Sequence, residues 1–204
     1  TIYTLMMLYG TDFKNPKYRK DWGYVGKFRI IPLNFGEYNG EKTFDFEEVG
    51  IATKDLSYED YLYVRSIALM VESLHNGRPF NEFFVYAKQY GIKPGIFLKT
   101  LLDNIELSGP KVRKVFKDFI EETKSELWDT EEALVSHYNQ EKNYKLLREG
   151  KVGGNLIYKY KSLSLTEAKH EWLDFFESEL LKLLTIQGKV TDFTKCKNEL
   201  SNIK

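Results

Sequence analysis

The chain has 204 residues, and its 30 Lys and Arg residues balance 30 Asp and Glu residues. The balance holds in each half: residues 1–102 carry 13 basic and 12 acidic residues, and the remainder carries 17 and 18. Surfaces that bind nucleic acid or anionic membranes need a basic excess. The charge pattern therefore argues against nucleic acid and membrane as partners. The length fits one large domain or two small ones, and it suffices to bury a core without disulfides.

Cys196 is the single cysteine of the chain. One cysteine forms no intramolecular disulfide, and it cannot by itself hold an iron–sulfur cluster or a Cys-type zinc site. Its isolation indicates a reducing compartment. The residues show no signal peptide, and the longest apolar runs, such as residues 67–71, are far shorter than the roughly 20 residues of a membrane span. We therefore expect a cytoplasmic protein.

The first 56 residues predict a strand-rich segment. Residues 2–8 are apolar and β-prone, as in a buried strand. Asn15 and Pro16 provide the cap and first position of a short helix that ends near Gly23. Two further strands are expected at residues 27–31, stopping at Pro32, and at residues 44–53, with an Asn39-Gly40 turn between them.

From Ser57 onward the apolar period becomes that of a helix. Ser57 and Asp60 have the spacing of a capping box for a helix that runs to about His75. Further one-sided helices are expected at residues 80–90, 94–105, 112–120, 130–150 and 166–184, with an amphipathic piece at 190–201. Residues 156–165 alternate in polarity and predict a strand.

These elements predict an α+β protein that is predominantly α-helical. Short strands lie at its N-terminal end, and the rest forms a helical, bundle-like body. We place the boundary between a strand-rich segment, residues 1–56, and a helical C-terminal domain, residues 57–204. The aromatic content of 15% predicts an aromatic core.

Two Glu-x-x-His pairs, Glu72 with His75 and Glu167 with His170, match the motif of carboxylate-bridged metal bundles. The ligands of such a bundle must face its interior. At about 100° per residue, Glu72, Glu167 and His170 fall opposite the apolar stripes of their helices. Because these side chains point away from the apolar side of their helices, the sequence favours solvent-exposed Glu–His pairs over a metal site.

Other catalytic motifs are absent from the sequence. It contains no G-x-S-x-G nucleophile elbow and no phosphate-binding glycine loop. The basic run at residues 111–117 is interleaved with apolar residues and followed by acidic ones, as on a solvated helix face.

Tyr58, Tyr61 and Arg65 share one face of the predicted helix. An Arg beside Tyr residues can bind an anion or a carboxylate. The same geometry serves an Arg that anchors the helix to the acidic strand residues Asp45, Glu47 and Glu48, and such structural pairs are the more common use.

Three segments carry a resemblance to a known family. They are residues 5–11 (LMMLYGT), residues 27–38 (KFRIIPLNFGEY) and residues 56–65 (LSYEDYLYVR). Their order and spacing resemble the region that follows the catalytic core in radical SAM enzymes with an N-terminal cobalamin-binding domain. The first segment resembles the closing strand of the barrel and its Leu-Leu-Pro-Gly-Thr turn, with Tyr9 in place of the Pro. The resemblance covers residues 1–75.

The resemblance implies that this chain is the C-terminal region of such an enzyme. It would cover the open edge of the barrel and shape substrate access, with the rest of the parent chain as its partner. The abrupt opening at Thr1, inside a predicted strand, fits a piece of a longer protein. Arg29, Tyr61 and Arg65 lie in the resembling segments and are the expected substrate-binding residues.

The resemblance further implies a parent enzyme with a 4Fe–4S cluster and S-adenosylmethionine, and with cobalamin where the parent binds it. The cluster motif C-x-x-x-C-x-x-C needs three cysteines, so this chain holds none of these cofactors and carries no catalytic residue of the family. Two alternatives stay open from the residues: a stand-alone helical interaction module without chemistry, and the carboxylate-bridged metal bundle.

Overall fold

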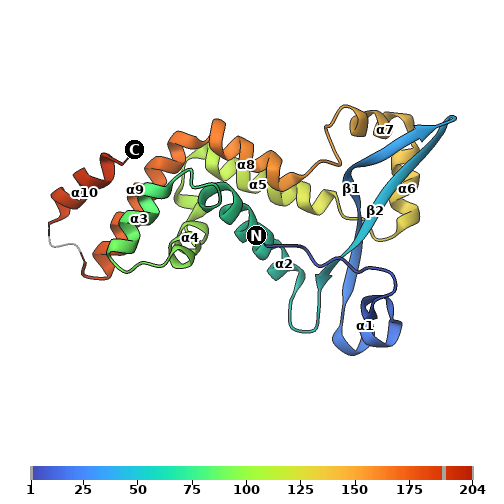
Figure 1. The fold of residues 1–204 in the computed structure, drawn as a ribbon, viewed down its shortest axis with the longest axis horizontal. Helices are drawn as coiled ribbons and strands as arrows, with labels where there is room; N and C mark the ends of the chain where they lie inside the picture. Colours follow the sequence, from blue (N-terminus) through green and yellow to red (C-terminus); the bar gives the residue numbers. More distant parts are fainter. Residues whose placement is uncertain (1, 190–191, 204) are drawn as a thin grey trace. The chain divides into compact units, whose positions relative to one another are not determined.

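A computed structural model describes residues 2–189 and 192–203 of the chain (Figure 1). Helix makes up 60% of the structure, and a two-stranded antiparallel sheet lies near the N-terminal end. The prediction of an α+β, predominantly helical fold is therefore confirmed.

The contacts divide the chain into two compact units. The hairpin unit comprises Ile2–Arg65 and Ile120–Leu156. The helical unit comprises Ser66–Phe119 and the described residues from Ile157 onward. Spatial contacts thus group residues 57–65 and 120–156 with the strands. The sequence boundary after residue 56 instead marks the change from a strand pattern to a helix pattern.

A β-hairpin is the centre of the hairpin unit. It pairs β1 (Val25–Tyr38) with β2 (Glu41–Ala52) in antiparallel register. Asn39 and Gly40 form the predicted turn with φ angles of 52° and 83°, a conformation that Asn and Gly adopt most readily. The prediction that the first strand stops at Pro32 is wrong. The register shifts between Ile30 and Phe35, and this bulge removes Pro32 from the ladder so that the strand continues beyond it.

Short bridges extend the hairpin on both edges. Met6 pairs with Val49 of β2, and Phe28 of β1 pairs with Trp128. The backbone bonds are Met7 N–H to Glu48 O, at 2.8 Å, and Gly50 N–H to Leu5 O, at 2.9 Å. The strand expected at residues 2–8 is therefore reduced to one bridge, with backbone hydrogen bonds to β2 from Leu5 and Met7.

Helix α1 (Pro16–Trp22) begins and ends as its sequence predicts. The Asn15 side chain accepts hydrogen bonds from the N–H groups of Lys17 and Tyr18. Gly23 ends the helix at a φ of 64°, and a Cβ there would lie 2.9 Å from the backbone N of Lys54. Glycine thus supplies both the left-handed conformation and the space that this turn requires. A 3-10 turn, Asp12–Lys14, precedes the helix.

Two helices, α6 (Glu131–Asn139) and α7 (Glu141–Arg148), lie beside the hairpin (Figure 1). The sequence predicted a single helix over residues 130–150. Gln140 has an extended backbone, with φ −67° and ψ 129°, and separates the two. The break lets both helices contribute to one core with Ile30 of β1, formed by Leu134, Tyr138, Tyr144 and Leu147.

The opposite face of the hairpin packs on α2 (Tyr58–Met70), which ends in a π-helical turn, Val71–His75. Ser57 and Asp60 form the predicted capping box: the Ser57 N–H donates to Asp60 Oδ2 at 2.9 Å, and the Asp60 N–H donates to Ser57 Oγ at 3.0 Å. Val49 and Ile51 of β2 pack against Tyr61 of α2 in a second core.

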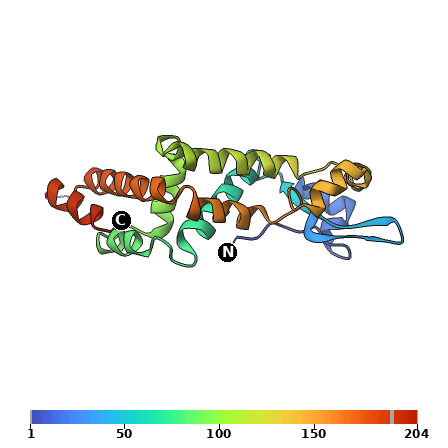
Figure 2. The same cartoon turned by 90° about the horizontal axis from the view of Figure 1, so that it is seen from above.

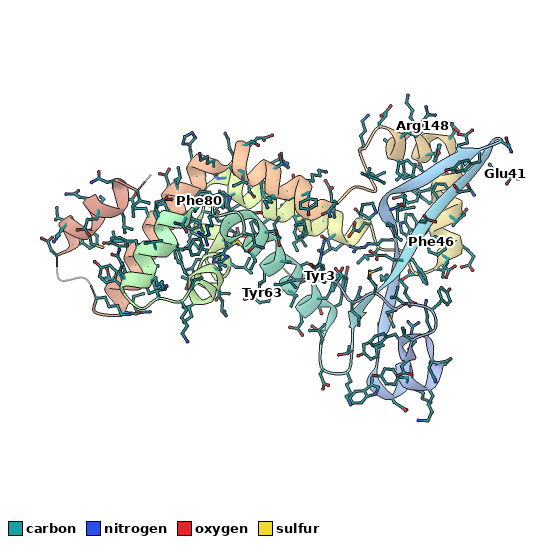
Figure 3. All side chains as sticks on the ribbon, viewed as in Figure 1. Tyr3, Glu41, Phe46, Tyr63, Phe80 and Arg148 are labelled. Atoms are coloured by element: carbon teal, nitrogen blue, oxygen red, sulfur yellow. The ribbon has the colours of Figure 1, made fainter. Side chains whose placement is uncertain are left out.

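The helical unit is built around an aromatic core. Its elements are α3 (Asn81–Gln89), α4 (Pro94–Asp103), the 3-10 turn Ile105–Leu107, the start of α5 (Pro110–Ser125), most of α8 (Leu156–Thr166), α9 (Lys169–Ile186) and α10 (Phe193–Ser201). The Phe176 ring of α9 lies 4.9 Å from Phe80, labelled in Figure 3, and 5.3 Å from both Phe83 and Phe97. The predicted aromatic core is present.

Helix α8 corrects the strand predicted at residues 156–165. Leu156, Tyr160 and Ser164 are buried at intervals of four, whereas Tyr158 is exposed. Over so short a segment, the same residues fit both the two-residue period of a strand and the four-residue spacing of a helix. Burial of residues on one side at helical spacing shows that the segment is a helix.

The helix predicted from residue 166, α9, begins at Lys169 instead, because Thr166 still belongs to the preceding helix. Thr166 is the last residue of α8, and its hydroxyl donates to the Ser162 carbonyl at 2.9 Å. The final predicted piece is α10, which lies next to α9 (Figure 2); its predicted residues 190–191 fall outside the described residues. Over the described ranges, no helix has the length and apolar character needed to cross a membrane.

Candidate functional site

Strand alternation places the consecutive acids Glu47 and Glu48 on opposite faces of the hairpin. Arg29 is paired directly with Glu47, and Phe28 with Glu48. Opposed residues in an antiparallel pair project to the same face. Each Glu is therefore the centre of a separate charged cluster.

The first, the Arg29 cluster, comprises Arg29, Glu47, Glu126, Tyr61 and Arg65. Arg29 Nε donates to Glu47 Oε1 at 2.7 Å, and its Nη1 donates to Glu126 Oε1 at 3.0 Å. The three side chains are only 16%, 10% and 20% exposed. Two Arg and two Glu residues give this cluster no net charge, so its cations are largely neutralised by its own carboxylates.

Burial controls the protonation of the Arg29 cluster. It raises the pKa of Glu126, although the nearby Arg29 acts to lower it. Burial also lowers the pKa of Arg65, and the positive charge of Arg29 adds to this effect. For Arg29 itself burial acts to lower the pKa, but Glu126 and Glu47 outweigh it and raise the pKa. The ion pairs with Glu47 and Glu126 thus favour the charged form of Arg29, whereas burial disfavours the charged form of Glu126.

Tyr61 brings a buried hydroxyl to this cluster. Its ring stacks on Tyr58, with centroids 6.0 Å apart, and burial raises the pKa of its hydroxyl. Within the described part of the chain, the hydroxyl has no hydrogen-bond partner. An unsatisfied buried hydroxyl costs about 1–3 kcal/mol, so the packing of this chain leaves an uncompensated polar atom beside Arg29 and Arg65.

The structure brings together all three residues that the sequence selected, Arg29, Tyr61 and Arg65. It also adds Glu126, which sequence reasoning missed because nothing local relates the end of α5 to a strand about a hundred residues earlier. Arg29 forms a direct ion pair with Glu47. That the three residues bind substrate stays a prediction.

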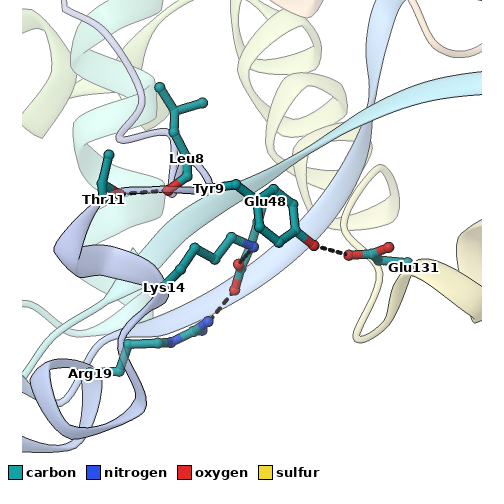
Figure 4. Close-up of polar contacts among 7 residues, drawn as sticks. All are labelled: Leu8, Tyr9, Thr11, Lys14, Arg19, Glu48 and Glu131. Atoms are coloured by element: carbon teal, nitrogen blue, oxygen red, sulfur yellow. Dashed lines mark hydrogen bonds and ion pairs between the residues drawn. The ribbon is translucent and has the colours of Figure 1, made fainter.

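The second cluster surrounds Glu48 (Figure 4). Lys14 pairs with Glu48 Oε2, and Arg19 Nη2 lies 2.7 Å from Oε1. The Glu48 side chain is only 4% exposed. The Lys14 ammonium also lies 4.2 Å from the centre of the Tyr9 ring, whose hydroxyl donates to Glu131 at 3.0 Å. Glu48 therefore fixes the segment before α1, and α1 itself, to the hairpin.

Gly26 makes room for the Glu48 carboxylate. A Cβ at Gly26 would lie 2.7 Å from Glu48 Cδ and 2.8 Å from its Cγ, closer than van der Waals contact permits. The sequence predicted a strand only from residue 27, whereas the structure places Gly26 inside β1, where a glycine often marks a close approach.

The two Glu-x-x-His pairs do not converge in space. Glu72 accepts a hydrogen bond from Asn76 Nδ2 at 2.7 Å, and the His75 ring packs edge-on against Phe84. Glu167 and His170 are exposed. Among residues 2–189 and 192–203, no three His, Cys, Asp or Glu side chains are grouped to hold a metal ion.

In comparisons with known proteins, no protein-family model matches the chain and no curated protein matches its sequence.

Replacing Tyr61 with Phe tests the unpartnered hydroxyl. We expect the free energy of unfolding of Tyr61→Phe to be unchanged or raised by up to about 1 kcal/mol, because the ring packing stays and an unsatisfied polar atom is removed. The matched variant is Tyr86→Phe, whose hydroxyl donates to Glu199 at 2.8 Å; it should lose about 1 kcal/mol. Urea unfolding measures both, and a loss at Tyr61 equal to that at Tyr86 would contradict the assignment.

Glu126 should make the protein less stable as the pH rises. Its pKa is raised in the folded state, so the folded chain binds the proton more tightly, and the stability gained below the unfolded pKa is lost as the pH rises through the folded pKa. We expect the wild type to lose stability relative to Glu126→Gln between about pH 4 and pH 7, measured by urea unfolding across that range.

Asp60 provides the control of opposite sign. Hydrogen bonds from Ser57 lower the pKa of Asp60, so the wild type should gain stability relative to Asp60→Asn as the pH rises. If both comparisons change in the same direction with pH, the raised pKa of Glu126 is refuted.

Gly26→Ala should break the Glu48 ion pairs. Because the added methyl displaces a buried carboxylate from two cations, we expect a loss of about 3 kcal/mol in the free energy of unfolding. Gly154→Ala is the control, since a Cβ there meets nothing within 4 Å, and it should stay within about 0.5 kcal/mol of the wild type. Equal stability of the two variants would show that Gly26 is not required for this packing.

Proposed function

We propose that this chain is the C-terminal region of a larger enzyme that resembles the cobalamin-type radical SAM enzymes. In this proposal the hairpin unit docks onto the barrel of the parent, covers its open edge and shapes substrate access. The chain does no chemistry alone. The observation that carries the proposal is that residues 2–9 are apolar but largely exposed.

Residues 2–9 are mostly apolar although most of their side chains are exposed. Six of the eight are large apolar residues that are exposed, among them Tyr3, which is 86% exposed, while Met7 is buried. A continuous apolar run of this kind is typical of a strand covered on both faces, as in a parallel barrel. The mismatch between apolar character and exposure supports a partner surface over this segment.

The backbone of the same segment presents an open edge. The bonds to β2 are made by Leu5 O and Met7 N–H, on either side of Met6. In an antiparallel bridge of this type, the N–H and C=O groups of the central residue face away from the partner strand. The Met6 peptide groups are therefore oriented to pair with one more strand, which supports a place at the edge of a larger sheet.

The residues of this chain do not fit the cofactors that the resemblance implies. Its one cysteine, Cys196, is buried, and its Sγ lies 3.4 Å from the Tyr86 hydroxyl oxygen. A 4Fe–4S cluster is held by several cysteines. A cluster, S-adenosylmethionine and cobalamin would therefore be held by the remainder of the parent, which is also the partner that this proposal names.

The Arg29 cluster has a defined place in the proposal. The Tyr61 hydroxyl, beside Arg29 and Arg65, would form a hydrogen bond with a polar group of a substrate or of the parent chain. The same proposal assigns the protein to the cytoplasm, supported by the lone reduced cysteine. The alternative of an interaction module uses the same open edge but takes its partner from a different protein.

Tyr3→Lys tests the docking of the edge segment. In the 204-residue chain the exposed Tyr3 should tolerate the change within about 0.5 kcal/mol. In the full-length parent, where this side chain is covered, the variant should lose about 2 kcal/mol or more by burying a charge. Thermal and urea unfolding of both proteins, with SAM cleavage by the reconstituted parent, give the comparison.

Tyr38→Lys is the matched control, because Tyr38 is 69% exposed at the hairpin turn and lies outside the edge segment. It should be neutral in both proteins. A gene without C-x-x-x-C-x-x-C upstream of Thr1 would refute the radical SAM assignment. A Tyr3→Lys effect that is the same in both proteins would refute the docking of residues 2–9.

A further inference from the structure

The helical unit contains a pocket that the function proposed above does not use. It has a volume of about 460 Å³ and lies where the π-helical turn ends and helices α3 and α4 begin. Its polar lining includes Asn76, Arg78, Asn81 and Lys88. These side chains come from residues within thirteen positions of one another, so the local fold alone gathers them.

The pocket carries positive charge that its own lining does not neutralise. Arg78 and Lys88 line it, and no carboxylate does. Glu72, one turn before Asn76, is held by the Asn76 amide at 2.7 Å and lies 3.9 Å from Lys161. No described residue forms an ion pair with Arg78 or Lys88. This contrasts with the Arg29 cluster, where carboxylates of the chain balance both Arg residues.

Arg78 is held in an uncommon backbone conformation. Its φ is +59°, and it follows Gly77 at +77°. A non-glycine residue in this region costs of order 1 kcal/mol and is found where the surrounding structure needs it. Glycine would adopt the conformation more easily. The strained position thus carries the guanidinium that lines the pocket.

The lining also has an apolar part beside the His75 ring. Phe84, Val85 and Pro94 contribute it, and the His75 ring packs edge-on against Phe84. Helices α3 and α4 both begin at this pocket without a side-chain cap on their first N–H groups, which adds partial positive charge to that of the two cations. One part of the pocket therefore suits an anion and the other a flat apolar group.

We propose that this pocket binds a phosphate monoester that carries a flat apolar group. Arg78 holds the phosphate through its paired N–H donors and Lys88 adds a second charge. The apolar group of the ligand lies against Phe84 and Val85. This site lies within the helical unit and does not depend on the docking of residues 2–9.

Phenyl phosphate is the probe, added to the 204-residue chain and followed by amide chemical shifts and calorimetry. We expect shifts confined to residues 75–94 and tighter binding than for inorganic phosphate, which lacks the ring, or benzylamine, which carries the opposite charge. Higher salt should weaken the binding. No binding at millimolar concentration, or equal binding of inorganic phosphate or benzylamine, would overturn the proposal.

Arg78→Gly separates binding from folding. Because glycine suits a φ of +59°, this variant should keep its unfolding midpoint while its affinity for phenyl phosphate falls roughly tenfold. Lys88→Gln should weaken binding in the same direction. Lys117→Gln changes the charge equally on an exposed face of α5 and should leave the affinity unchanged. An Arg78→Gly protein that binds as tightly as the wild type would also overturn the proposal.

Discussion

The register of the β-hairpin is the constraint on which the hairpin unit depends. Pairing Arg29 with Glu47 and Phe28 with Glu48 places one acid on each face. Glu47 then meets Arg29 on the face that packs on α2, and Glu48 meets Lys14 and Arg19 on the other. A slip by one residue would exchange the two faces, leaving both apolar cores and both buried carboxylates without their partners.

The two units use charge in different ways. In the hairpin unit, cations and carboxylates are enclosed together, and their chief effect is to fix the segments that meet on the sheet. In the helical unit, the apolar aromatic core around Phe176 provides the packing, and Arg78 and Lys88 line a pocket that holds no carboxylate. Buried pairs favour a defined arrangement of chain segments, whereas cations without partners are free to attract a ligand.

Residues 2–9 connect the fold to the proposed function. A single bridge to β2 holds them, yet their apolar side chains have the character of a strand in the interior of a sheet. Local energetics within this chain do not explain that composition, because exposed apolar side chains gain nothing from it. A partner strand over this edge would explain both the composition and the free peptide groups of Met6.

The sequence by itself determined the helical character, the Asn15 and Ser57 caps and the Asn39-Gly40 turn, because each depends on residues within one turn of chain. It also selected Arg29, Tyr61 and Arg65, which lie together. Only the tertiary structure decided that residues 156–165 are helical and that Glu126 and Gly26 complete the charged clusters. Those outcomes depend on which surfaces distant segments bury against one another, and a local pattern of polarity does not contain that information.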